Sequence, residues 1–384
     1  FVQVSKAITP DMEGDVIGGS VNFITRPSPA KKTLLASAAY GYHGQSQSRI
    51  LNGSLIYGNR SKDDKFGYIF SAATWNRDWG SDNFELVYNT GSSDPIHSIQ
   101  QLQLRDYLGN RTTWGFNGAM DYSFNNNNKI YFKGLWTDFQ DDETRYRTRF
   151  RFGRAEEDIT AGRIEHALTH TLYHSRFKGA EFGGENGLSD KIKLDWKLSS
   201  YQANFWYDSP INTGVGLFDS PGPENSENLG YYFSTWIQND VTFDDMVNVD
   251  GRYYKFFSCD SPTGVGESDV DNFQPRVSAN TPIDASQAAL SNTTASGRWI
   301  KERDYTGRFD LTINASDKVT FKVGSKYRIK DRISNRAVTI WRPDGDVFMT
   351  DVENEPFPTR GGFLTEIDAP YNEFLVNYPT RNAN

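Results

Sequence analysis

Three histidines recur at every fourth position, at His166, His170 and His174. On a helix this spacing would place the three imidazoles on one face, where they could share a metal ion. On a strand, four residues span about 13 Å, which is too far for one ion. The neighbouring Thr169 and Tyr173 favour a strand. We therefore predict structural or solvent-facing histidines and no metal site.

Other chemical motifs are weak. Asp269-Val270-Asp271-Asn272, after Glu267, partly matches a calcium loop but lacks the central glycine and the closing glutamate. We interpret it as an acidic surface loop. The sequence has no Gly-rich phosphate loop, paired-histidine motif or nucleophile elbow, and its single cysteine, Cys259, cannot form an internal disulfide. The sequence therefore predicts no catalytic residues, no cofactor and no enzymatic activity.

The stretch 205–297 is both acidic and aromatic. It holds 13 acids and three bases, whereas the whole chain has a net charge of −8. Its many rings either form a small core or face a ligand, because flat rings and carboxylates suit sugar faces and hydroxyls; the core is the favoured interpretation. A short helix over 284–290, capped by Asp284, is also expected. The candidate ligand-contacting residues are Trp206, Tyr207, Tyr231, Tyr232 and Trp236.

Composition restricts the fold class. Aromatic residues make up 14% of the chain, hydrophobic residues 37%, and no run of 18 apolar residues exists. A helical membrane protein is thereby excluded, and disorder is disfavoured because disordered chains lack aromatics. The negative net charge disfavours a nucleic-acid binder. A β protein with one apolar and one polar face remains.

Alternation of apolar and polar residues is the strongest signal. In Val319–Lys330, for example, Val319, Phe321 and Val323 oppose Thr320 and Lys322. We predict nine strands, the eighth of the following segments being ambiguous between strand and helix. They are Leu34–Tyr42, Leu51–Gly58, Phe66–Trp75, Trp114–Asn125, Ile130–Phe139, Lys191–Leu198, Phe309–Asn314, Ala167–Glu181 and Val319–Lys330.

The connections between these strands alternate between short and long. Residues 76–112, 140–166 and 204–303 are the long ones. This alternation places all tight turns at one end of the sheet, which is typical of an antiparallel transmembrane β-barrel with periplasmic turns and extracellular loops. Nine strands would leave such a barrel incomplete, since an open sheet edge in lipid exposes unpaired backbone groups. The fold class is therefore all-β, as part of a longer barrel.

The first thirty residues carry a family resemblance. The run ITPDMEGDVIGGSVNFITR, Ile8 to Arg26, closely resembles the last part of the plug domain in TonB-dependent outer-membrane receptors. Val323–Arg332 also resembles a barrel strand of that family, and the Pro-Asp-Met form resembles a subgroup often linked to glycan uptake. The plug-motif residues are Pro10, Asp11, Gly14, Gly18, Gly19 and Asn22.

The resemblance implies an organisation and an activity. Residues 1–30 would be the end of the plug with its linker, and 31–384 the first part of a 22-stranded barrel with a long extracellular loop, 204–303. The protein would take up a scarce solute, a glycan or a siderophore-type ligand, across the bacterial outer membrane. Its partners would be the TonB energy-transducing protein, outer-membrane lipid, the solute and a surface lipoprotein. A passive porin, a surface adhesin and a secreted carbohydrate-active β protein are the alternatives.

Charge bears on where the plug segment lies and on the solute. Bases on the polar strand faces need partners, and Asp11, Glu13 and Asp15 are candidates, so we expect residues 1–26 inside the barrel. The acidic stretch 205–297 would repel anions, although salt screens this effect beyond about 8 Å. The sequence therefore favours a neutral glycan over an anionic iron chelate.

Overall fold

The structure is a computed structural model of the 384-residue chain. It describes residues 2–6, 20–23, 26–44, 48–88, 99–151, 162–208, 231–241, 257–258, 274–275, 286–351, 354–355 and 378–379. All strand pairings among these residues are antiparallel, which confirms the all-β class. No helix among them is long and apolar enough to cross a membrane.

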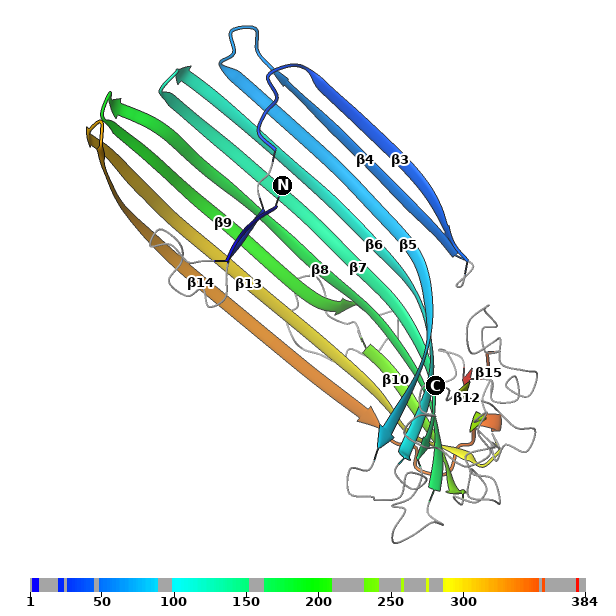
Figure 1. Cartoon of the computed structure of the whole chain (residues 1–384). Helices are drawn as coiled ribbons and strands as arrows, with labels where there is room; N and C mark the ends of the chain where they lie inside the picture. Colours follow the sequence, from blue (N-terminus) through cyan, green and yellow to red (C-terminus); the bar gives the residue numbers. More distant parts are fainter. Residues whose placement is uncertain are drawn as a thin grey trace.

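One large sheet of ten strands dominates the molecule (Figure 1). Neighbouring strands follow chain order from β3 to β9, then β13 and β14, and β10 pairs with both β8 and β13. The strands are β3 (Thr33–His43), β4 (Ser48–Arg60), β5 (Phe66–Tyr88), β6 (Ile99–Asn125), β7 (Asn128–Arg151), β8 (Gly162–Ser189), β9 (Ile192–Asp208), β10 (Tyr231–Val241), β13 (Ala288–Ser316) and β14 (Val319–Trp341).

The remaining elements are short. They are the pairs β1 (Val2–Ser5) with β2 (Ser20–Phe23), β11 (Phe257–Ser258) with β12 (Gln274–Pro275), and β15 (Asn354–Glu355) with β16 (Tyr378–Pro379), and the 3-10 helix η2 (Met349–Asp351).

All nine predicted strands are present, and the ambiguous eighth is strand throughout β8. The sequence analysis assigned too many residues to the long connections between strands. β10 and the first half of β13 lie within 204–303, so this interval is not a single loop, and Ala288–Leu290 is strand and not helix. The reason is physical: apolar alternation ends where one face stops being apolar, but backbone hydrogen bonds to neighbouring strands continue beyond that point.

The tight turns gather at one end of the sheet, which we call the turn end (Figure 1, upper left). They are residues 61–65, 126–127, 190–191 and 317–318. In the first, Asp64 has a φ of 57°, and its amide donates to the Ser61 carbonyl at 3.0 Å. The opposite end, which we call the loop end, is where β3, β5, β7 and β9 terminate.

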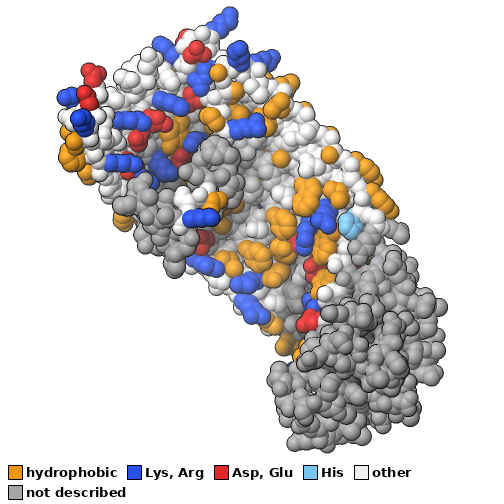
Figure 2. Space-filling model, viewed as in Figure 1, with side chains coloured by type: hydrophobic (Ala, Val, Ile, Leu, Met, Phe, Trp, Pro, Cys, Tyr) orange, Lys and Arg blue, Asp and Glu red, His pale blue; other side chains and the backbone are white. Residues whose placement is uncertain are grey.

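The sheet has two chemically different faces over the half nearest the turn end. The register places Leu55, Phe70, Phe116 and Phe132 on one face, which we call the apolar face. These side chains are 45–48% exposed, and Val323 reaches 62%. The opposite, charged face carries interspersed basic and acidic side chains, as on the sheet surface visible in Figure 2. So extensive an exposed apolar surface indicates contact with lipid or with another protein.

The clusters of buried apolar groups lie toward the loop end. Tyr146 packs with Leu168, and Trp236 packs with Ala288 and Met349. At the sheet's outer edges, β3 pairs only with β4 and β14 only with β13 within the part of the chain that the structure describes. The sheet is therefore open in this part of the chain.

Candidate functional site

A cleft of about 710 Å³ lies on the charged face, where β7, β8, β9, β13 and β14 run side by side. Its lining combines uncharged side chains with cations and anions, among them Lys133, Glu181, Lys197, Asp304 and Arg328. These residues share the face because every second residue of each strand points to it.

Ion pairs across neighbouring strands hold this surface together. The Nζ atoms of Lys133 and Lys197 lie 3.6 and 3.1 Å from the two carboxylate oxygens of Glu181. The Arg328 Nε atom lies 2.5 Å from the Asp304 carboxylate. Several bases for which the sequence suggested plug acids as partners therefore have partners within the sheet itself.

Four aromatic rings lie next to one another on the same face, nearer the loop end. They are Phe139, Tyr173, Phe205 and Tyr207, which we call the aromatic patch, and their centroids are 5.4–6.3 Å apart. The Tyr173 hydroxyl donates to the Asp141 carboxylate at 3.1 Å, and burial raises the pKa of Tyr173 to about 12. The patch combines apolar ring faces with fixed polar groups, as solute-binding surfaces do.

Beyond the patch, the charged face becomes strongly basic. Arg145, Arg147, Arg149 and Arg151 alternate along β7, so the strand period puts all four on the face that carries Lys133. Two further arginines come from the neighbouring strands, Arg105 of β6 and Arg163 of β8. We call these six residues the arginine cluster.

Sequence reasoning missed this cluster because it assigned 140–166 to a loop. The signal was nonetheless present in the run RYRTRFR, residues 145–151, where arginine occupies every second position. Such period-2 patterning indicates a strand whatever the polarity of the repeated residue.

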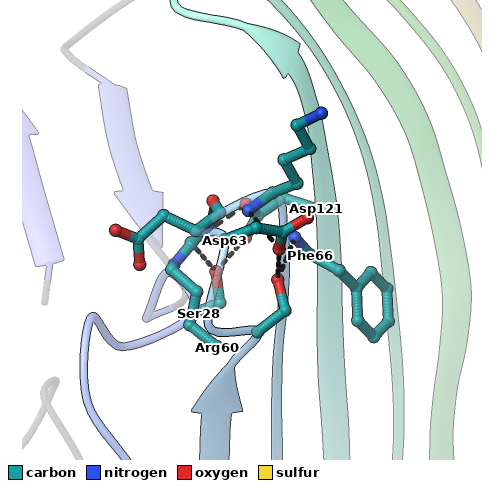
Figure 3. Close-up of polar contacts among 8 residues, drawn as sticks. Ser28, Arg60, Asp63, Phe66 and Asp121 are labelled. Carbon is teal, nitrogen blue, oxygen red and sulfur yellow. Dashed lines mark hydrogen bonds and ion pairs between the residues drawn. The ribbon is translucent and has the colours of Figure 1, made fainter.

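The linker before β3 is tied to the charged face near the turn end (Figure 3). The Ser28 hydroxyl donates to the Asp121 carboxylate, and the Arg60 guanidinium bonds both Ser28, at 2.6 Å, and Asp121, at 3.0 Å. A Cβ at Gly58 would lie 2.8 Å from the Pro29 ring, so glycine lets the linker approach the sheet closely.

The five candidate aromatic residues do not share one surface. Tyr207 belongs to the aromatic patch, whereas Trp206 stacks on His174 on the opposite face, with centroids 4.8 Å apart. Trp236 is 2% exposed and packs in the small core with Ala288 and Met349. Tyr231 and Tyr232 begin β10, opposite Thr171 and His170, and their side chains lie outside the described residues.

Most of the plug motif also lies outside the described residues: Pro10, Asp11, Gly14, Gly18 and Gly19. Asn22 is in β2, opposite Gln3.

The three histidines are on a strand, as predicted. His166 and His170 are fully buried and contact Thr148 and Thr144 through Nδ1 at 3.2 and 2.8 Å. No group of three or more histidine, cysteine or acidic side chains in the described ranges is placed to hold a metal ion. The candidate calcium loop, 267–272, lies outside those ranges.

Comparison with known proteins gives no family assignment. No protein-family model matches the chain, and no curated protein is significantly similar to it.

Proposed function

We propose that this chain is part of an outer-membrane transporter of the TonB-dependent type, which takes up a scarce solute with energy from an inner-membrane partner. The observation that supports this most is the exposed apolar face, formed by successive strands whose opposite face is charged. A bilayer would cover the apolar face, and the charged face would line the interior of the barrel.

The position of the linker adds support. Residues 26–32 follow the plug-like sequence, and Ser28 is bonded to the charged face through Asp121 and Arg60. A plug segment on this side of the sheet would lie inside the barrel and close it. Such a plug would separate an active transporter from a passive porin, whose lumen stays open.

The solute path in this proposal runs along the charged face. The aromatic patch and the arginine cluster would lie on the extracellular side, because they are nearest the long connections. The paired ions around Glu181 and Asp304 would lie at membrane depth, beside the plug.

Energy dependence is the property that tests this function. Cells that express the intact protein would be given a fluorescent oligosaccharide mixture, with and without the energy-transducing protein. We expect accumulation only when that protein is present and the proton gradient is intact. Accumulation that persists after the gradient is collapsed would indicate a porin, and surface binding without accumulation would indicate an adhesin.

A further inference from the structure

The arginine cluster is crowded with like charges. Arg105 lies directly opposite Arg147 across the β6–β7 pair, and Arg151 directly opposite Arg163 across the β7–β8 pair. Like charges in directly opposite positions destabilise a sheet. Repulsion within both pairs must therefore be offset by acids or by a ligand.

The acids of the sheet neutralise only part of this charge. Glu165, 1% exposed, accepts from Arg149, from Arg151 at 3.4 Å and from Arg163 at 2.7 Å, and Glu85 pairs with Arg105 at 2.5 Å. Among the described residues, these two carboxylates form ion pairs with four of the six guanidinium groups, and the Glu143 carboxylate attracts Arg145. Burial, followed by repulsion from Arg147, Arg151, Arg163 and Arg105, lowers the pKa of Arg149 to about 10.

The excess positive charge is arranged for recognition by contact. Guanidinium groups are planar forks that bind sulfate, phosphate or carboxylate oxygens in pairs. The side chains of Arg151 and Arg163 remain 44% and 37% exposed. The six residue steps from Arg145 to Arg151 span about 20 Å of extended strand, so the row is longer than one acidic group requires.

The aromatic patch continues the same row. Phe139, Asp141 and Glu143 precede Arg145 at every second position of β7. Between patch and cluster, Arg111 contacts the Trp79 ring at 4.3 Å and the Asp141 carboxylate at 2.8 Å. One extended ligand could therefore lay rings on the patch and anionic groups on the cluster.

We propose that the arginine cluster binds the acidic groups of an anionic oligosaccharide. This inference rests on the proposed function and names the substrate class for it. It departs from the neutral glycan that the acidic stretch 205–297 favours, because direct guanidinium contacts act at about 3 Å, whereas long-range repulsion is screened beyond about 8 Å.

The test measures binding to the intact protein in detergent micelles by calorimetry, at physiological salt. The probes are a heparin-derived octasaccharide and the same octasaccharide after desulfation and N-acetylation. We expect the sulfated probe to bind and the desulfated probe to bind at least tenfold more weakly. Equal affinity for the two, or no binding of the sulfated probe, would overturn the proposal.

Charge variants locate the site. The double variant Arg147→Gln with Arg151→Gln removes one partner from each like-charge pair, and we expect it to lose roughly 10- to 100-fold in affinity. The matched control, Lys193→Gln with Lys322→Gln, removes the same charge from the same face near the turn end and is expected to keep its affinity. Equal losses in both would mean a general electrostatic attraction, which contradicts a localised site.

Two further readouts separate this site from a structural role and from the proposed function. Circular dichroism checks that the arginine variant is folded, and Arg147→Lys with Arg151→Lys, which keeps both positive charges, should recover part of the affinity. Binding in micelles does not need transport. Binding without energy-dependent uptake would refute only the transporter, and uptake of an uncharged solute without binding of the sulfated probe would refute only the anionic substrate.

Discussion

At the scale of single residues, burial decides what the histidines can do. His166 is fully buried on β8, with Nδ1 3.2 Å from the Thr148 hydroxyl oxygen. Burial penalises the charged imidazolium and lowers the pKa of His166 from 6.5 to about 4. The side chain is therefore a neutral core group at pH 7.

This pKa predicts acid sensitivity at the loop end of β8. Between pH 6.5 and 4 the imidazole of His166 binds a proton in the unfolded state but not in the folded state. The free energy of unfolding is therefore at its full value above pH 6.5 and falls as the pH decreases. At pH 5 the loss should be on the order of 2 kcal/mol. Amide hydrogen exchange over 162–171 measures it, with His166→Gln as the control that should lose less between pH 7 and 5. Identical losses in both proteins would contradict this assignment.

At the scale of strands, the pleat separates the two faces residue by residue. Leu198 is 58% exposed on the apolar face, whereas Ser199, its neighbour on β9, lies on the charged face opposite Glu181 and lines the cleft. Because the two residues are adjacent, they lie at nearly the same depth in any membrane.

This neighbouring pair tests which face meets lipid. Leu198→Arg should destabilise the protein in bilayers by about 2–4 kcal/mol if it lies near the midplane, and by less toward the interface. Ser199→Arg adds the same charge beside the Glu181 carboxylate and should cost much less. Denaturant titrations in lipid vesicles compare the two, and equal penalties would argue against the membrane assignment.

The linker also belongs to this scale. Asp121 and Arg60 are 8% and 17% exposed, and breaking a buried ion pair by removing one partner costs about 3–5 kcal/mol. Asp121→Asn should therefore loosen residues 26–32 from the sheet and speed proteolysis there. The control is Asp195→Asn, which removes an exposed carboxylate paired with Lys193 at 3.0 Å and should leave the linker protected. Unchanged cleavage in Asp121→Asn would mean that the linker is held by other contacts.

At the scale of the whole molecule, the sheet has two edges that need partners. Within the described ranges β3 pairs on one side only, and so does β14. In a bilayer each unpaired backbone group costs several kcal/mol, and exposed edges pair with other chains.

We therefore expect the 384-residue chain, refolded alone in detergent, to form oligomers through these edges. Unheated gel electrophoresis and light scattering would detect them. The control is the same chain with β14 residues Thr320 and Lys322 replaced by proline, which removes ladder donors and should reduce association. A stable monomer with heat-modifiable mobility would mean that the two edges pair with each other.

Much of the fold was determined locally and could be predicted from the sequence. Eight strands follow from side-chain alternation, whereas Ala167–Glu181 stayed ambiguous until the structure showed it as strand. The tight turns follow from the short connections between the strands. The sequence of each strand is sufficient there because one face of the sheet is consistently apolar. The positions of the apolar residues therefore show which side chains of that strand point to which face. The strand assignment of His166, His170 and His174 follows instead from the β-propensity of neighbours such as Thr169 and Tyr173.

Only the tertiary structure decided where the strands end and what they bring together. β10 joins the sheet by pairing with β8 and β13, and its neighbours in space are far from it in the chain. The six arginines come from three strands, and the two like-charge pairs exist only because the register sets Arg105 opposite Arg147 and Arg163 opposite Arg151. Likewise, Trp206 and Tyr207 are neighbours in sequence and yet face opposite sides of the sheet. Register between distant strands depends on long-range hydrogen bonds, and a single segment of sequence does not carry that information.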